Sequence, residues 1–159
     1  MSSTREALYK AYEGEAKAAL RLKVFAEKAD SEGYKQISQL FRAISFSEEV
    51  HGARALKVLK DIKSTEENLA DSFESEQKVA GVAYDQFIKQ AEEEGNRAAV
   101  LHFSQSRDAE EIHAKLYKNA LDNVMEERET QYYVCKVCGY VADGYLPDVC
   151  PICNAKKEQ

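Results

Sequence analysis

The sequence has few residues that break helices. Its only two prolines, Pro147 and Pro151, both fall close to the C-terminal end, so the first 146 residues carry none. Proline in a helix interior removes a hydrogen bond and clashes with the preceding turn. Its absence leaves a long N-terminal region free to be helical.

The chain also lacks a long apolar run and an excess of positive charge. No stretch approaches the ~20 apolar residues that a membrane span needs, and the N-terminus carries no apolar leader. Lys and Arg number 22 against 28 Asp and Glu, which gives a formal net charge of -6. These features exclude a membrane span and disfavour a nucleic-acid partner. We expect a cytoplasmic protein.

Cysteine is missing from most of the chain and then appears in two close pairs. Cys135 with Cys138 and Cys150 with Cys153 form two Cys-x-x-Cys hooks. In a chain expected to be cytoplasmic, such pairs favour metal binding over disulfides. Their spacing predicts one tetrahedral four-thiolate site, which would hold either iron as a one-electron carrier or zinc as a structural ion.

Before residue 130, apolar and special residues recur at alternating steps of three and four, the spacing of one helix face. Four such stripes predict a bundle of four helices, each of about 25 to 30 residues. The first two stripes are Leu8, Tyr12, Glu15, Ala19, Leu22, Ala26 and then Ile37, Phe41, Ile44, Glu48, His51, Ala55, Ile62. The other two are Leu69, Phe73, Glu76, Ala80, Tyr84, Phe87, Ala91 and then Ala99, Phe103, Ser106, Glu110, His113, Tyr117, Ala120, Val124.

An internal repeat divides this region into two helical hairpins. The segment Phe25–Gly33 resembles Phe87–Gly95 at a shift of 62 residues. Each segment ends on a glycine, where a hairpin is expected to turn.

Both halves of the repeat carry the same Glu-x-x-His motif. At the 62-residue shift, Glu48 and His51 fall on Glu110 and His113. Glu and His three residues apart project from one face of a helix, so each pair can hold a metal ion. Their position on an otherwise apolar face favours a metal site over a buried polar network, because unpaired carboxylates there would be costly.

The other two helices each supply a further carboxylate. Glu15 lies on the first stripe, and its counterpart Glu76 lies one residue earlier than the repeat requires. An extra residue in the third helix, such as a π-bulge, would absorb this slip. One Glu from each of two helices, with Glu-x-x-His from each of the others, is the two-metal pattern of ferritin-like bundles. Tyr84 shares the third stripe and could donate a hydrogen bond to a ligand carboxylate.

The character of the chain changes after residue 130. The run Tyr132–Val134 favours a strand, and the turn-forming residues Gly139, Gly144, Pro147 and Pro151 follow it. We therefore predict a bundle domain over residues 1–130 and a small β domain over residues 131–159. The second domain is too short for a self-supporting apolar core, so a bound metal must supply much of its stability.

The chain resembles the rubrerythrins over nearly its whole length. The six bundle residues match that family's diiron ligands, and Cys-x-x-Cys-Gly-Tyr with Cys-Pro-Ile-Cys matches its rubredoxin-like tail. The resemblance implies a mainly α fold in which two non-haem irons reduce hydrogen peroxide to water and the tail iron supplies electrons. It also implies an electron-donating reductase or rubredoxin as partner, and homodimers with the tail of one subunit near the bundle of another.

Two positions depart from the family pattern. Val79 stands where the family commonly has a further Glu that replaces the second-helix histidine on oxidation, and Leu22 stands where it has a tyrosine. We therefore expect His51 to keep its metal in both oxidation states. Two other functions stay open: oxidation of iron for storage, and a non-redox role with zinc in the tail.

Overall fold

A computed structural model describes residues 3–125 and 129–157, without the side chains of Val79 and Ala80. The chain divides into two compact units, Met1–Lys63 and Ser64–Gln159. Helices dominate both units, and the strands occur near the C-terminus. This confirms the predicted mainly α fold with a small β region after it.

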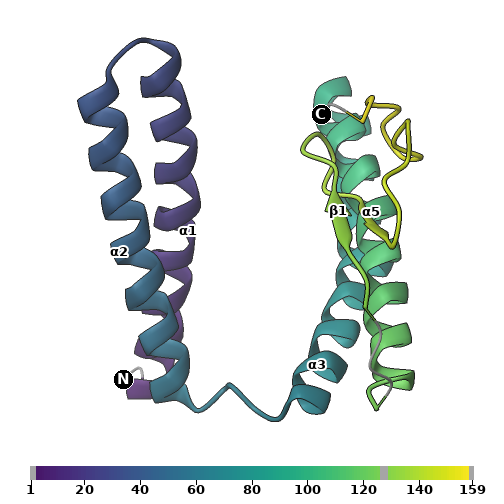
Figure 1. Ribbon diagram of the computed structural model, residues 1–159, viewed down its shortest axis with the longest axis horizontal. Coiled ribbons are helices and arrows are strands. Elements are labelled where there is room, and N and C mark those ends of the chain that lie inside the picture. Colours follow the sequence, from purple (N-terminus) through teal and green to yellow (C-terminus); the bar gives the residue numbers. More distant parts are fainter. Residues whose placement is uncertain (1–2, 126–128, 158–159) are drawn as a thin grey trace. The chain divides into compact units, whose positions relative to one another are not determined.

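The first unit is a hairpin of two long helices. Helix α1 spans Thr4–Ser31 and helix α2 spans Lys35–Leu59, and the two lie side by side along their length (Figure 1). Ser3 and Glu6 form a reciprocal capping box at the start of α1, which satisfies free N–H groups of the first turn. Gly33 has a φ of 84° in the turn, a conformation that glycine adopts without steric cost.

Small side chains fill the contact between α1 and α2. The buried residues of the two helices are Ala19, Ala26, Ala29, Ser38, Ser45, Gly52, Ala55 and Leu59. The Ser45 hydroxyl donates a hydrogen bond of 2.8 Å to the carbonyl oxygen of Ala19. Several larger residues of the predicted stripes are exposed, among them Ile37 at 45%, Ile44 at 39% and Ile62 at 57%. The hairpin therefore closes on its small residues and leaves large apolar side chains uncovered.

A polar cluster fixes the end of α2 against the start of α1. Arg5 donates to the carbonyl oxygen of Leu59 at 3.1 Å and lies 3.0 Å from a carboxylate oxygen of Asp61. The Tyr9 hydroxyl also donates to Asp61. Lys60 ends the helix in the left-handed conformation, with φ of 58°. The chain leaving α2 is thus held in place as far as Asp61.

The second unit begins with an interrupted helix. Helix α3 spans Thr65–Lys78, the π-helical turn η1 spans Val79–Ala83, and helix α4 spans Tyr84–Glu93. A π turn accommodates one extra residue in a helix, so the prediction of an extra residue in the third helix is confirmed, and the structure places it after Glu76. The helical path then turns at Gly95, which has a φ of 68°.

Helix α5, Arg97–Asp122, returns along this interrupted helix. The Asn96 side chain accepts a hydrogen bond from the Ala99 N–H and caps its first turn. Ala91, Ala109 and Ala114 are buried in α4 and α5. Ala114 corresponds to Gly52 in the repeat, so both hairpins place a small residue directly after the histidine of Glu-x-x-His.

The C-terminal part of the second unit is built on two short strands. Strand β1, Tyr132–Val134, pairs antiparallel with strand β2, Val141–Asp143. The predicted strand at Tyr132 is thereby confirmed. The predicted domain boundary near residue 131 falls between the end of α5 and the start of β1, and the division at this point stays a prediction.

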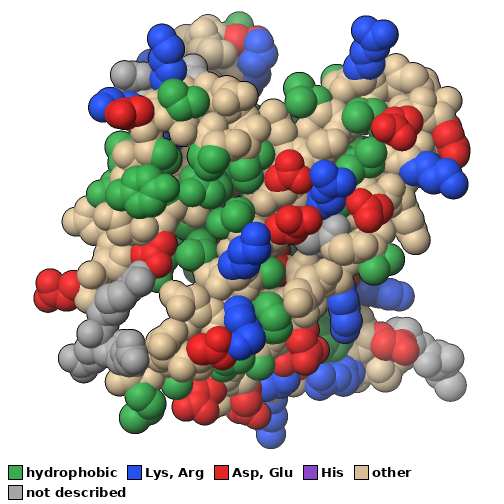
Figure 2. Space-filling view, turned by 90° about the vertical axis from the view of Figure 1, so that its right-hand side faces the viewer, with side chains coloured by type: hydrophobic (Ala, Val, Ile, Leu, Met, Phe, Trp, Pro, Cys, Tyr) green, Lys and Arg blue, Asp and Glu red, His purple; other side chains and the backbone are tan. Residues whose placement is uncertain are grey.

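On the face drawn in Figure 2, acidic and basic side chains are intermixed. Within the described ranges, no helix is both long and apolar enough to cross a bilayer.

Candidate metal centres

The first unit brings three predicted ligands together. Glu15 from α1 joins Glu48 and His51 from α2, with one ligand atom of each within 4.8 Å of the others. His51 Nδ1 lies 3.0 Å from Glu48 and 3.9 Å from Glu15. A Cβ atom added at Gly52 would make an ordinary van der Waals contact of 3.7 Å with that of Glu15. Position 52 therefore faces Glu15 across the contact between α1 and α2 and has room for a residue as small as alanine.

The second unit repeats this arrangement. Glu76 from α3 joins Glu110 and His113 from α5, and their ligand atoms also lie within 4.8 Å of one another. His113 Nδ1 lies 3.3 Å from Glu110 and 4.0 Å from Glu76. Each unit thus holds a carboxylate–carboxylate–histidine triad in which the histidine turns Nδ1 toward the two acids.

The paired carboxylates perturb each other's protonation. A hydrogen bond with Glu48, together with burial, raises the pKa of Glu15, whereas hydrogen bonds with Glu15 and His51 lower the pKa of Glu48. Burial and the neighbouring Glu110 raise the pKa of Glu76 to about 7. Two close carboxylates cannot both be ionised cheaply. A bound cation would replace the shared proton of each pair and relieve this repulsion.

The second triad also touches the C-terminal domain. His113 Nε2 lies 3.0 Å from the carbonyl oxygen of Gly139. A carbonyl oxygen only accepts hydrogen bonds, so Nε2 carries the hydrogen. This tautomer leaves a lone pair on Nδ1, directed at the triad. A backbone carbonyl on the far nitrogen is the usual support for a metal-binding histidine.

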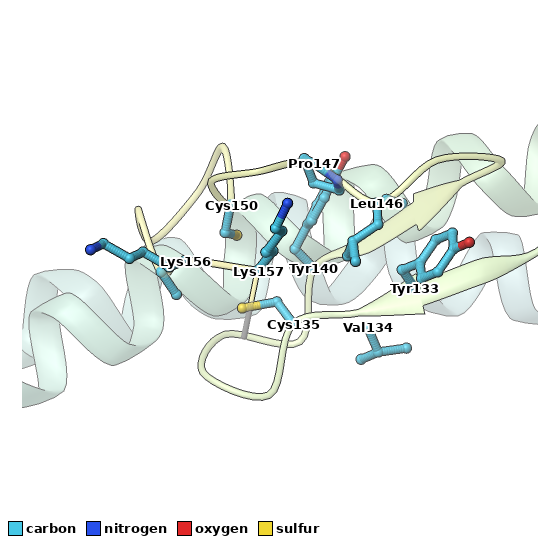
Figure 3. Close-up of a pocket in the computed structure, with 11 residues that line it drawn as sticks. Tyr133, Val134, Cys135, Tyr140, Leu146, Pro147, Cys150, Lys156 and Lys157 are labelled. Carbon is cyan, nitrogen blue, oxygen red and sulfur yellow. The ribbon is translucent and has the colours of Figure 1, made fainter. Parts of the chain in front are cut away.

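The four cysteines converge as the sequence predicts. Cys135 and Cys153 have their sulfur atoms 3.6 Å apart, as do Cys138 and Cys150. Such distances are too long for a disulfide and approach the ~3.8 Å edge of a tetrahedron with metal–sulfur bonds of ~2.3 Å. In Figure 3, Cys135 and Cys150 come from separate loops and direct their sulfur atoms into the space between them.

Two matching loops hold these thiols. The N–H of Cys135 donates to the carbonyl of Tyr140, and the N–H of Gly139 donates back to Cys135, both at 2.9 Å. The second loop repeats the pattern, since Cys150 donates to Ala155 and Asn154 donates back to Cys150. The fifth residue of each loop is left-handed, with a φ of 81° at Gly139 and 60° at Asn154.

The thiols differ in their readiness to ionise. Burial raises the pKa of Cys138 and of Cys153. Burial also acts to raise the pKa of Cys135, but hydrogen bonds from the N–H groups of Cys138 and Val137 and with the thiols of Cys153 and Cys138 together outweigh it and bring the pKa down to about 7. Four thiolates this close together need a cation at their centre.

Three further residues that the sequence analysis singled out are not members of either triad. The Tyr84 ring packs against Phe87 and Phe103, with centroids 6.0 and 6.2 Å away. The hydrogen bonds found in the described ranges include none from the Tyr84 hydroxyl to a triad carboxylate, so its role as a donor stays a prediction. Leu22 is partly buried in α1. Val79 opens the π turn, and its side chain lies outside the described part of the structure.

Both donor sets suit iron. Carboxylate with imidazole is the ligand set of di-iron bundles, and four thiolates in a tetrahedron bind iron or zinc. Among the residues that the structure describes, the Gly139 carbonyl contacts a triad without having been predicted from the sequence. Glycine there is explained by its loop conformation alone, so nothing in the residue type signals a contact with His113.

Comparison with known proteins identifies the family. Residues 6–121 match the Rubrerythrin family, and residues 133–159 match the rubrerythrin rubredoxin-like domain. Rubrerythrin-2 of Clostridium acetobutylicum is 30% identical, over 98% of this chain and 94% of that protein. Nigerythrin of Nitratidesulfovibrio vulgaris is 30% identical, over 99% of this chain and 85% of its own length.

Solved structures agree with the sequence comparison. A structure described as the fully reduced, all-ferrous state of nigerythrin superposes with a TM-score of 0.59, covering 99% of this chain and 85% of that one. A partially reduced state of nigerythrin gives 0.60. With matches to both family domains and relatives aligned over nearly the full length, this chain belongs to the rubrerythrin family.

Proposed function

We propose that this protein is a peroxide reductase, in which a di-iron site made from the two triads reduces hydrogen peroxide and the four-cysteine domain supplies electrons. The observation that carries the proposal is the contact between His113 and Gly139, which joins one triad to the loop of Cys138. A storage oxidase or a structural zinc protein has no need of such a link between its two metal sites.

Each residue of the two triads has a proposed role. Glu48 and Glu110 would bridge the metal ions, while Glu15 and Glu76 would bind one ion each. The two histidines would bind opposite ions through Nδ1, the nitrogen that faces the acids in both triads. Two ferrous ions held there would supply the two electrons that, with two protons, convert hydrogen peroxide into two water molecules.

The C-terminal domain is proposed to carry single electrons. The covalent path from Cys138 to Gly139 and one hydrogen bond to His113 connect the thiolate site to the triad. The hydrogen bond fixes the tautomer of His113 and orients its ring toward the metal. The same hydrogen bond would be part of the path for electrons from the thiolate site to the triad. An external reductase or rubredoxin would reload the tail.

Stopped-flow reoxidation of the fully reduced protein tests this function. We expect hydrogen peroxide to reoxidise the bundle faster than dioxygen does, with the tail following. The Val79 position predicts slower turnover than in relatives that have a carboxylate there. Equal or faster reoxidation by dioxygen would indicate an oxidase, and no reoxidation by either oxidant would indicate a non-redox protein.

The tail metal needs its own measurement. Metal analysis with a visible spectrum separates iron from zinc, because a ferric tetrathiolate absorbs visible light and zinc does not. A colourless, zinc-loaded tail in protein purified from iron-rich cells would contradict the proposed electron route.

A further inference from the structure

Each unit of the chain forms only one half of a four-helix bundle. Each holds three ligand residues, whereas the two-metal pattern needs six. In the first unit His51 is half exposed, with 51% of its side-chain surface accessible. Ile37 and Ile44, on the same predicted stripe, are exposed as well. A second hairpin must cover this face to complete the site and bury its apolar surface.

The Glu-x-x-His motifs determine how the two hairpins must face each other. In each motif the histidine lies ~4.5 Å along the helix from its Glu, toward the C-terminus. If His51 and His113 bind opposite ions, as in the proposed site, α2 and α5 must run in opposite directions. Helix α3 is the antiparallel neighbour of α5 in its hairpin, so α3 must run parallel to α2. Ferritin-like bundles meet this requirement with one long crossover connection.

The distance that such a crossover must cover depends on the helix lengths. Glu48 lies 11 residues before the end of α2 at Leu59, and Glu76 lies 11 residues after the start of α3 at Thr65. At ~1.5 Å per residue each segment is ~16.5 Å long. With the ligands level and the helices parallel, the end of α2 and the start of α3 are ~33 Å apart along the bundle.

The connection in this chain is too short for that distance. Leu59 and Thr65 are joined by six Cα steps, which reach at most ~22 Å when fully stretched. The usable length is smaller still, because Asp61 is bound to Arg5 in the first unit. Ser64 accepts from the Glu67 N–H at 3.2 Å and caps α3 in the second. The three steps from Asp61 to Ser64 reach only ~11 Å.

We infer that the bundle is completed by hairpin exchange between two copies of the chain: the first unit of one copy pairs with the second unit of the other, so each di-iron site takes three ligands from each chain. The inference rests on the proposed ligand set. The occupant of the exposed first-unit face is a second copy, because that copy supplies the matching triad and the matching apolar stripe. In the exchanged dimer the short connection between Leu59 and Thr65 does not have to span the length of the bundle.

Hairpin exchange also accounts for the position of the tail. The resemblance to the family implies a tail that lies near the bundle of another subunit, yet here the tail contacts α5 of its own chain. An exchanged dimer satisfies both conditions, since that α5 pairs with the first unit of the other copy. The tail would then serve a site that both chains build.

Mixed dimers of two variants test the exchange. Glu48→Ala damages the first triad and Glu110→Ala damages the second. The two chains, carrying different tags, are co-expressed and purified by both tags in succession. With exchange, one site of the mixed dimer is wild type throughout and the other carries both substitutions. We expect bundle iron to return to about half that of the wild-type dimer, although neither variant alone retains it.

The result does not depend on peroxide chemistry, because iron content and bundle absorption are read without oxidant. The tail iron, measured by its thiolate absorption, serves as an internal control for folding and should be the same in all samples. A mixed dimer with no more bundle iron than the single variants would overturn the exchange. So would a wild-type monomer that holds two bundle irons.

A lengthened linker provides the matched control. Insertion of about 30 Gly and Ser residues after Ile62 gives a root-mean-square reach of ~30 Å, enough for one chain to close its own bundle. The gain in bundle iron on mixing Glu48→Ala with Glu110→Ala should then be lost in the long-linker background, while the long-linker parent keeps its iron. An undiminished gain would show that linker length does not enforce the exchange.

Discussion

The Nε2 atom of His113 lies 3.0 Å from the carbonyl oxygen of Gly139, the residue that directly follows Cys138. The Nδ1 atom of the same ring lies 3.3 Å from Glu110. One imidazole therefore bridges a carboxylate triad and a thiolate loop, and its orientation depends on both. A substitution in the loop should therefore alter the orientation of His113 in the triad, although no triad residue is replaced.

Gly139→Ala tests this coupling. Gly139 has a φ of 81°, so an added Cβ should strain the loop by about 1–2 kcal/mol and displace the carbonyl from His113. We expect electron transfer from tail to bundle to slow in single-turnover experiments on the reduced protein.

Gly144→Ala is the matched control for that experiment. Gly144 has a nearly equal φ of 80°, and a Cβ atom added there would meet the Thr130 hydroxyl at 3.7 Å and not His113. It should lower tail stability to a similar extent and leave internal transfer unchanged. Equal slowing in both variants would mean that general destabilisation, and not the His113 contact, sets the rate.

Cys150→Ser should remove the visible thiolate absorption and leave the bundle metals in place, because the two ligand sets share no residue. Visible spectra with metal analysis measure both effects. Asn154→Gly, in the same loop, should keep the colour, since glycine favours the φ of 60° found there. Colour that survives in Cys150→Ser would show that the tail assignment is wrong.

Glu110→Ala should affect the metals of the bundle and leave the metal of the tail in place. Because Glu110 is proposed to bridge both metal positions, its loss should weaken iron binding in the bundle by more than the ~10–100-fold typical of outer-shell substitutions. The tail absorption should persist. Glu111→Ala removes the exposed neighbouring acid and should retain both signals, whereas joint loss of both signals in Glu110→Ala would argue against separate sites.

The raised pKa of Glu76 predicts an unusual pH dependence for the folding stability of the metal-free protein. Burial, with the neighbouring Glu110, raises the pKa of Glu76 to about 7 from an ordinary value of 4.5. Between these values the folded chain holds a proton that the unfolded chain has released, so stability should fall as pH rises from about 4.5 to 7. Iron binding displaces this proton, and affinity for iron should rise over the same range.

Urea unfolding of the metal-free protein at pH 5 and pH 7.5 measures this effect. Glu76→Gln cannot ionise and should lose that part of the pH dependence, while Glu74→Gln, an exposed acid on the same helix, should keep it. A metal-free wild type that grows more stable across this range would contradict the raised pKa.

The triads could be predicted because the Glu-x-x-His motif recurs at equivalent positions of the internal repeat. Equal spacing of Glu48 with His51 and Glu110 with His113 marks a common role, and the slip at Glu76 correctly indicated an inserted residue that the π turn accommodates. The two Cys-x-x-Cys pairs were equally informative, because four thiolates that bind one metal ion require this spacing of the cysteines.

Other features could not be read from periodicity. The stripes treat Ala26 and Ile37 alike, but Ala26 is buried between α1 and α2 while Ile37 is 45% exposed. A helical pattern identifies an apolar face and does not show which neighbour covers it. The link from Asp61 to Arg5 was also missed, since a surface charge pair over 56 residues of separation leaves no local signal.

The π turn at Val79–Ala83 lets the two hairpins differ in length and keep the same inner face. In a regular α-helix the extra residue would rotate Glu76 by ~100° relative to Tyr84 and Phe87. The wider π turn takes up that residue, so the carboxylate and the aromatic contacts of α4 stay on one face. Deleting one residue of the turn should therefore restore the exact repeat and a regular α-helix and keep Glu76 in its triad.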